Sequence, residues 1–144
     1  MRVREASSGD AAAVAGLLTQ LGYPSTAEEA RGRLAAWDGE GPRRVLVAEH
    51  GGAVAGLVAV AAVPYLERGG SWARIVALAV DAGHRRRGIG RQLVAAAEAA
   101  AAGWGCVTIE ATSSRRRAES HPFYRRLGYG EECERSALYR RSLG

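Results

Sequence analysis

The sequence predicts a mixed α/β fold in which an antiparallel first half leads into one parallel pair of strands. Short apolar runs alternate with helical patterns, as is typical of a sheet covered by helices. A glycine turn joins the runs 45–49 and 54–60, which favours an antiparallel hairpin. The runs 72–80 and 106–112 flank a long alanine-rich stretch, which favours a parallel pair joined by a crossover helix. The chain of 144 residues has the size of one domain, 1–144.

The first half is expected to contain one strand and two helices before the hairpin. Residues 3–5 predict a short strand, and Ser8-Gly9-Asp10 is a helix-start signal before an apolar helical face. Thr26 and Glu29 have the spacing of a capping box, which predicts a second helix that ends at Asp38-Gly39. The hairpin turn falls at 50–53, where two glycines are adjacent.

The second half is expected to alternate strands and helices. Gly103 and Gly105 end the alanine-rich helix, and Pro122 suits the first turn of a short one. The whole order is then βααβββαβαββ. The elements expected after the hairpin are a strand at 72–80, a helix at 90–104, a strand at 106–112, a helix at 121–127 and strands at 129–133 and 136–141.

The chain is basic, with a formal net charge of +5 and a pI near 9.9. A nucleic-acid-binding protein is one alternative that this charge allows. The arginines, however, gather at 85–87, 91, 115–117 and 125–126, and no aromatic residues interleave the two arginine triplets, as a single-strand binder would require. An anionic small ligand therefore explains the charge better than nucleic acid.

Cysteine content and hydropathy exclude other classes. Cys106 and Cys133 are the only cysteines, without a CxxC motif or histidines at ligand spacing, so no metal site is expected. Cys106 lies in an apolar strand pattern and is expected to be a packing residue. No run approaches 18 apolar residues and residues 1–5 lack the apolar core of a signal peptide, so we expect a cytoplasmic protein without a membrane partner.

The turn at 80–91, VDAGHRRRGIGR, joins a strand to a helix and suits phosphate binding. Gly88 and Gly90 let the backbone approach a ligand closely, and the helix that follows leaves its first N–H groups unpaired. The turn lacks the third glycine of a Rossmann fingerprint, and no lysine is present for a Walker loop.

A second motif follows at 117–129, RAESHPFYRRLGY. Together with the Arg-x-x-Gly-x-Gly turn, it resembles the two signatures of the GNAT superfamily of N-acetyltransferases, in the expected order and spacing. The resemblance implies that acetyl-CoA is the cosubstrate and that no metal takes part. It also implies that the central parallel pair splays apart and that the pantetheine arm pairs with the exposed edge of the first of these strands.

Residue by residue, the resemblance places the amide that polarises the thioester carbonyl at Leu78, and the hydroxyl that faces the departing sulfur at Tyr124. Residues 115–117 or 125–126 are alternatives for a second phosphate. The residues expected to bind the coenzyme are Leu78, Ala79, Val80, Arg85, Arg86, Arg87, Gly88, Ile89, Gly90, Arg91, Arg117 and Tyr124.

The proton acceptor for the amine is not settled by the sequence. The histone-acetylating branch of the family has a glutamate four residues before the Leu78 position, where this chain has Arg74. Glu110 on the neighbouring strand is the expected substitute, with Glu67, His121 and water as alternatives. The chain also has Arg117 and Ser120 where many members have asparagine and alanine, a variant similar to the small-molecule-acetylating branch.

The resulting hypothesis is an N-acetyltransferase that moves an acetyl group to a primary amine of a small molecule by direct attack in a ternary complex. Neither cysteine lies where the motifs would make it a nucleophile. A coenzyme-A-binding regulatory module without turnover and a protein or peptide acetyltransferase remain as alternatives. A homodimer is compatible with the sequence.

Overall fold

The computed structural model describes residues 1–112, 120–132 and 136–144. The chain divides into two compact units, residues 1–112 and residues 113–144, which we describe separately. The single domain 1–144 stays a prediction. The first unit contains both strands of the parallel pair and the glycine turn. The second unit contains the short helix of the second motif.

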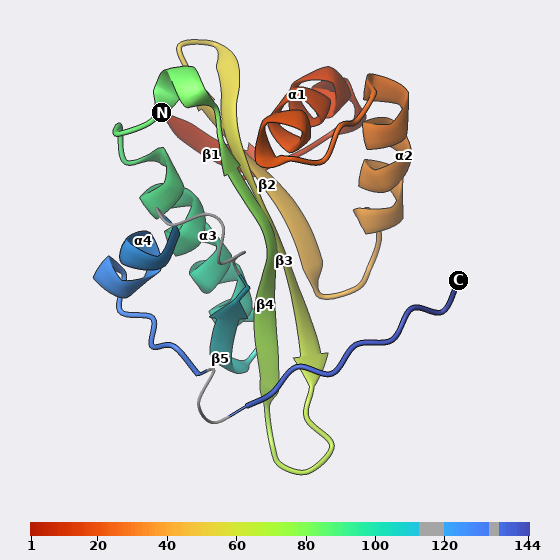
Figure 1. The fold of residues 1–144 in the computed structure, drawn as a ribbon, viewed down its shortest axis with the longest axis vertical. Coiled ribbons are helices and arrows are strands. Elements are labelled where there is room, and N and C mark those ends of the chain that lie inside the picture. The colour runs from red at the N-terminus through yellow and green to blue at the C-terminus, as the bar shows by residue number, and fades with distance from the viewer. Residues whose placement is uncertain (113–119, 133–135) are drawn as a thin grey trace. The chain divides into compact units, whose positions relative to one another are not determined.

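The first unit is a five-stranded sheet with the order β1-β2-β3-β4-β5 (Figure 1). Its first four strands pair antiparallel, and β4 pairs with β5 in parallel, as the sequence predicts. The strands are β1 (Arg2–Glu5), β2 (Arg43–His50), β3 (Ala53–Pro64), β4 (Ser71–Val80) and β5 (Cys106–Ala111).

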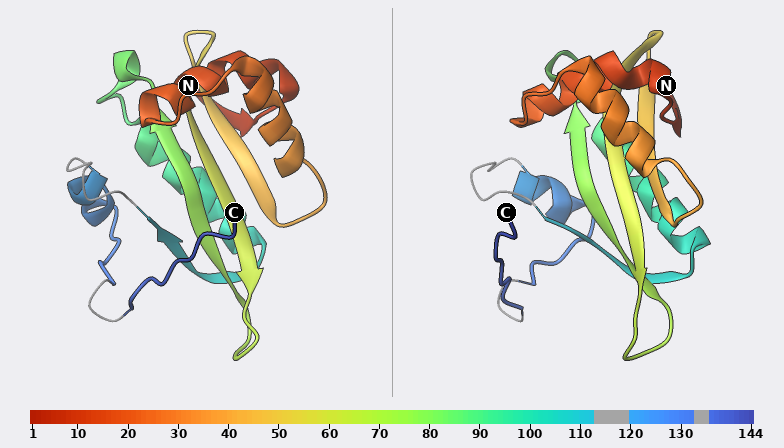
Figure 2. Two further views of the ribbon diagram at one scale, coloured as in Figure 1. Left: turned by 45° about the vertical axis from the view of Figure 1, so that its right-hand side comes forward. Right: turned by 90° about the vertical axis from the view of Figure 1, so that its right-hand side faces the viewer.

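Helices cover both faces of this sheet (Figure 2). The helices of the unit are η1 (Ser8–Asp10), α1 (Ala11–Leu21), α2 (Ala27–Trp37), η2 (Ala82–His84) and α3 (Ile89–Gly103). Val14 and Leu17 of α1 pack with Leu57 and Ala79 in a buried cluster on one face. On the other face, α3 buries its apolar side, so both faces of β4 are shielded at its carboxyl end.

Local signals in the sequence form as expected. The Thr26 hydroxyl accepts from the Glu29 amide at 3.1 Å, and the Glu29 carboxylate accepts from the Thr26 amide at 2.9 Å. Gly51 and Gly52 have φ of 60° and 82°, as a two-residue hairpin turn requires. Near the chain start, the Arg4 guanidinium of β1 forms an ion pair with buried Asp10 of η1, which links the two elements. Its hydrogen bonds lower the pKa of Asp10 to about 2.

The second unit contains α4 (Ser120–Arg126), as the sequence predicts. The two strands expected at 129–133 and 136–141 are not formed in the described residues of those ranges. Strands form where a neighbouring strand accepts their backbone hydrogen bonds. Residues 136–144 are exposed throughout, with Tyr139 91% exposed, so this segment buries no apolar face that would fix a strand register.

Candidate active site

The carboxyl-terminal half of β4 has one open edge. The ladder between β4 and β5 runs from Ser71 opposite Cys106 to Ile75 opposite Ala111 and then stops. Beyond it, residues 77–80 pair only with β3 in the part of the chain that the structure describes (Figure 1). The β3–β4 register shifts so that Val76 has no partner on β3, which makes it a β-bulge. The bulge lies one residue beyond the last β4–β5 pair, Ile75 opposite Ala111.

The open edge presents the backbone groups of Leu78 and Val80. The Asp81 amide donates to the Ala55 carbonyl at 2.8 Å, which makes these two residues a hydrogen-bonded pair. Hydrogen-bonded and non-hydrogen-bonded pairs alternate along antiparallel strands. Val80 opposite Gly56 and Leu78 opposite Val58 are therefore non-hydrogen-bonded pairs, whose N–H and C=O groups face away from β3.

The turn after β4 is held by a side-chain network that reaches to α1. Asp81 accepts from the Gly83 amide at 3.1 Å and faces His84 Nδ1 at 2.8 Å. Gln20 donates from Nε2 to Asp81 at 2.7 Å and accepts from the Ala82 amide at 2.9 Å. The hydrogen bond from Gln20, followed by that from His84, holds the pKa of Asp81 below its usual value. The carboxylate form is therefore the form that fixes the turn.

Gly88 begins α3 in a conformation that favours glycine. Its φ is +76°, and a Cβ built there would meet no atom within 4 Å, so the space above it is open. No side chain caps this helix, and its first intrahelical bond joins the Gln92 amide to the Gly88 carbonyl at 3.1 Å. The amides of Ile89, Gly90 and Arg91 thus remain without an intrahelical partner.

The start of α3 is anchored closely against the sheet. Ile89 is fully buried, and a Cβ at Gly56 would lie 3.2 Å from its Cγ2 atom and 2.9 Å from Leu93 Cδ1. Glycine at position 56 therefore lets the first turn of α3 sit directly beside the end of β4. This packing brings the open strand edge and the unpaired helix amides together.

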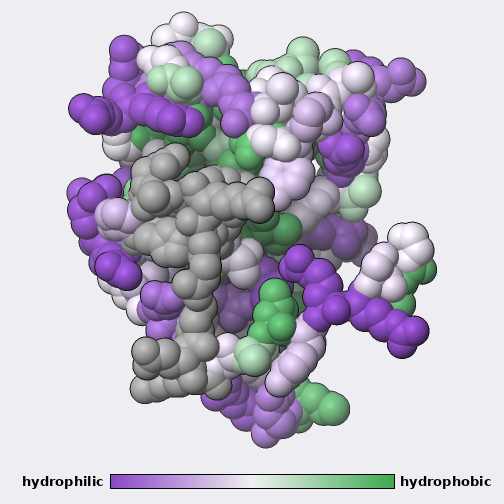
Figure 3. Space-filling view, viewed as in Figure 1, coloured by the Kyte–Doolittle hydropathy of each residue, from purple (hydrophilic) through white to green (hydrophobic). Residues whose placement is uncertain are grey.

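Four exposed arginines surround this helix start: Arg85, Arg86, Arg87 and Arg91. None of them forms an ion pair with a carboxylate in the described part of the chain. Figure 3 shows a strongly hydrophilic surface at the upper left, over the turn between β4 and α3. Free guanidinium groups, helix amides and an open glycine fit a pyrophosphate, and the strand edge fits an extended amide-containing arm such as that of coenzyme A.

The opening, by which we mean the space beside residues 77–80 of β4 beyond the last β5 pair, has Glu110 and Arg74 at its lower end. These two side chains form an ion pair. The two residues are register partners on β5 and β4, one rung before the ladder ends. Arg74 Nε donates to Glu110 Oε1 at 2.9 Å, and Nη2 contacts the same oxygen. The Arg74 guanidinium lies 5.3 Å from the Trp72 ring centroid. The predicted proton acceptor is thus adjacent to the opening, but one of its oxygens already accepts from a cation.

Several of the predicted residues belong to the second unit, residues 113–144. Tyr124 is half-buried in α4, with its ring 5.2 Å from Phe123 and 5.5 Å from Tyr129. Arg125 forms an ion pair with Glu131 at 3.8 Å. Residues 115–117, including Arg117, lie outside the described residues, as do the side chain of His121 and Cys133.

The other two candidates have clear surroundings. Glu67 is exposed in the loop between β3 and β4. Cys106 is half-buried in β5, and burial raises the pKa of its thiol, which keeps it protonated and suits a packing role.

Sequence reasoning missed Gln20 and the pairing of Arg74 with Glu110. Gln20 lies 61 residues before Asp81, and no local pattern marks a lone glutamine on a helix as a partner for a distant turn. The Arg74–Glu110 pair could have been found, because parallel strands of known register place these positions opposite each other.

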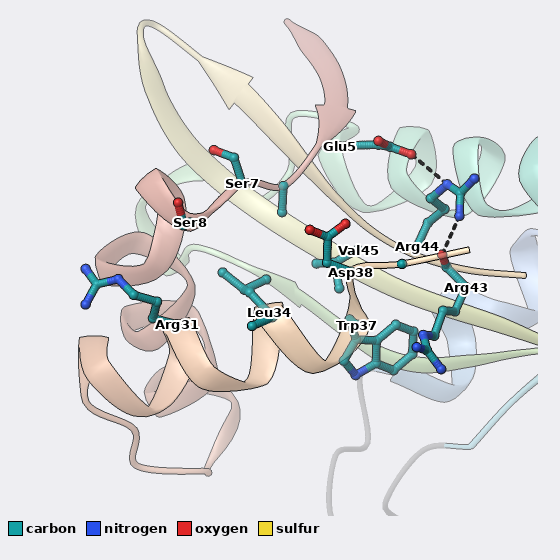
Figure 4. Close-up of a pocket in the computed structure, with 13 residues that line it drawn as sticks. Glu5, Ser7, Ser8, Arg31, Leu34, Trp37, Asp38, Arg43, Arg44 and Val45 are labelled. Carbon is teal, nitrogen blue, oxygen red and sulfur yellow. Dashed lines mark hydrogen bonds and ion pairs between the residues drawn. The ribbon is translucent and has the colours of Figure 1, made fainter. Parts of the chain in front are cut away.

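A hollow of about 480 Å³ lies away from this edge, between α2 and the strands β1 and β2 (Figure 4). Leu34 and Trp37 line it from α2, and an ion pair between Glu5 and Arg44 closes one side at 2.6 Å. The hollow contains none of the residues that the two sequence motifs single out.

An open strand edge followed by an uncapped, arginine-flanked helix start suits a ligand that carries phosphates and an extended arm. Comparison with known families shows the class of protein. The Acetyltransferase (GNAT) family matches residues 13–129. The chain belongs to this family and is a GNAT acetyltransferase, a membership that implies the use of acetyl-CoA. No curated protein sequence matches the chain.

Solved structures share the fold over the whole chain. A candidate acetyltransferase from Agrobacterium tumefaciens is 25% identical, with a TM-score of 0.86 over 99% of this chain and 100% of that one. Glucosamine-6-phosphate N-acetyltransferase from Arabidopsis thaliana is 21% identical, with a TM-score of 0.82 over 99% and 98%. An aminoglycoside 6'-N-acetyltransferase from Acinetobacter haemolyticus is 18% identical, with a TM-score of 0.81 over all of both chains. The GNAT-like fold is thereby confirmed.

Within the described ranges, none of the helices combines the length and the apolar composition that crossing a bilayer requires.

Proposed function

We propose that the protein is an N-acetyltransferase that transfers the acetyl group of acetyl-CoA to a primary amine of a small molecule. The observation that carries this proposal is the open edge of β4 beside the uncapped start of α3. Similar structures support the choice of acceptor class, since two of them are described as acting on glucosamine 6-phosphate and on an aminoglycoside.

The turn would bind the pyrophosphate of the cosubstrate. The amides of Gly90 and Arg91 donate from the helix start, while Arg85 and Arg86 add charge-assisted hydrogen bonds. Val80 and Leu78 offer backbone groups for an extended arm along the strand edge. These contacts would hold the acetyl group in position before the amine binds. Holding both reactants in the reactive geometry lowers the activation free energy in a ternary complex.

The Leu78 amide would then stabilise the transition state. A rigid N–H directed at the carbonyl oxygen gains strength as negative charge develops there, and such a donor is worth about 3 kcal/mol. The nitrogen–carbon bond forms as the carbon–sulfur bond breaks. Tyr124 would donate its phenolic hydrogen to the departing thiolate, as a phenol with an ordinary pKa of about 10 can do at neutral pH.

The amine must lose a proton before it attacks. An alkyl ammonium with a pKa of about 10.4 is only about one part in a thousand neutral at pH 7. Glu110, one rung before the end of the β4–β5 ladder, can accept this proton directly or through water, and its Oε2 has no partner among the described residues. Glu67 and His121 are the alternatives.

A pH–rate profile of Glu110→Gln tests this role. We expect the largest loss of rate near neutral pH and a smaller loss at alkaline pH, where more of the amine is already neutral. Glu28→Gln serves as the control, because Glu28 is an exposed residue of α2 with no proposed role, and Glu67→Gln tests the alternative acceptor. A Glu110→Gln profile that superimposes on that of the parent would leave solvent as the proton acceptor.

The function itself is tested by thiol release from acetyl-CoA with a panel of amines. An enzyme releases thiol in proportion to acetylated amine, whereas a regulatory module binds coenzyme A tightly without turnover with any amine. Acetyl label retained on the protein after removal of acetyl-CoA would contradict direct attack.

A further inference from the structure

The Arg74–Glu110 pair leaves specific groups available to a ligand. Both contacts of the pair end on the same oxygen of Glu110, so Oε2 can accept a further hydrogen bond. On Arg74, the Nη1 group has no acceptor among residues 1–112, 120–132 and 136–144. A free carboxylate oxygen and a free guanidinium nitrogen therefore lie side by side at the base of the opening.

The pair is also accessible. The side chains of Arg74 and Glu110 are 41% and 51% exposed. An ion pair exposed to this extent contributes little to stability, because water screens it. A ligand with charges of both signs can bind to it, or exchange partners with it, at little cost to the fold.

Neighbouring residues hold the pair at a fixed place. Trp72 stacks on the Arg74 guanidinium from two rungs further along the ladder. On that rung, the Thr108 hydroxyl lies 2.9 Å from the hydroxyl of Tyr65. Aromatic rings and hydroxyls thus line the side of the pair toward the β3–β4 loop, while the bulge at Val76 and the open edge lie on the other side.

We propose that this pair selects acceptor amines that also carry an anionic group, a carboxylate or a phosphate, a few bonds from the nitrogen. The ammonium binds Glu110 Oε2 and the anion binds the Nη1 group of Arg74. A simple cationic amine fits less well, since Arg74 repels it and the guanidinium gains no partner.

This proposal rests on the proposed function for its acceptor, and binding can be measured apart from turnover. The probes are two matched pairs, 4-aminobutyrate with butylamine and 2-aminoethyl phosphate with 2-aminoethanol. Titrations of the protein saturated with coenzyme A give affinities, and thiol release gives kcat and KM. The variants are Arg74→Gln and, as a control, Arg68→Gln, which removes an exposed arginine that stacks on Tyr65 at 4.1 Å.

We expect the anionic member of at least one pair to bind about tenfold more tightly than its neutral counterpart. Arg74→Gln should abolish that preference by raising KM with kcat little changed, whereas Arg68→Gln should retain it. The carboxylate and phosphate pairs distinguish the two anions. Equal binding within both pairs, or a preference that survives Arg74→Gln in a folded variant, overturns the proposal. Selective binding without thiol release supports the ligand class and contradicts the enzymatic function instead.

Discussion

The two halves of β4 differ in whether their edge toward β5 is paired. Residues 71–75 are paired on both edges, with β3 on one side and β5 on the other. Residues 77–80 pair with β3, and their second edge has no partner strand among the described residues. The bulge at Val76 is the boundary, and the same strand thus anchors the sheet below it and offers backbone hydrogen bonds above it.

The side chains follow the same division. Arg74 in the paired half contacts its register partner Glu110, and neither backbone group is available to a ligand. In the open half, Ala79 is buried in the apolar cluster with Val14 and Leu57. We therefore expect side-chain identity to matter for acceptor choice in the paired half and for packing at Ala79, with the proposed cosubstrate contacts made by the backbone.

The largest effect on turnover is expected from Tyr124→Phe. This variant tests whether the backbone groups of the open half of β4 support catalysis without a phenolic proton donor. Removal of the phenolic hydrogen should lower kcat by about 10²–10⁴-fold, the usual contribution of general acid catalysis, with acetyl-CoA affinity nearly unchanged. Steady-state kinetics across pH and calorimetry measure the two quantities. Activity equal to that of the parent at every pH would make Tyr124 a packing residue.

Proline substitutions in the open half distinguish the backbone N–H groups that face the open edge from those that face β3. Leu78→Pro removes an N–H that faces the open edge, so we expect about 10²–10³-fold lower turnover with the β3 ladder retained. Ala79→Pro is the matched control, because its N–H faces β3 and its loss should cost about 3 kcal/mol of unfolding free energy. The assignment of Leu78 is wrong if its proline variant turns over normally.

Gly88→Glu breaks the site at the turn. A carboxylate beside the pyrophosphate should weaken acetyl-CoA binding at least tenfold, about 1.4 kcal/mol. Since Gly88 has a φ of +76°, any side chain adds backbone strain. Gly88→Asn is the control, because asparagine tolerates this conformation and carries no charge. Calorimetry on both folded variants separates the effects, and equal affinities would place the phosphates elsewhere.

The smallest effect is expected from Gln20→Leu, which removes the link from α1 to the turn. The Ala82 amide loses its acceptor, a net cost of about 1 kcal/mol, so acetyl-CoA affinity should fall about fivefold while kcat stays the same. A change in kcat alone would mean that α1 acts on the acceptor rather than on the turn.

Most of the first unit could be predicted from local patterns. The capping box at Thr26, the glycine hairpin and the parallel pair each depend on residues close in sequence or on a chirality rule, and all formed as expected. The terminal strands did not form in the described residues, because strand pairing depends on a partner that the local pattern does not specify. The contacts of Gln20 and Arg74 likewise depend on tertiary register.

The central claim is that acetyl-CoA binds along the open half of β4 and the start of α3. Residue-resolved amide hydrogen exchange with and without coenzyme A tests it most directly. We expect new protection at Leu78, Val80 and the amides of residues 89–91, with no change at 72–75, which are already paired. Protection confined to residues outside 78–91, or equal in both halves of β4, would contradict it.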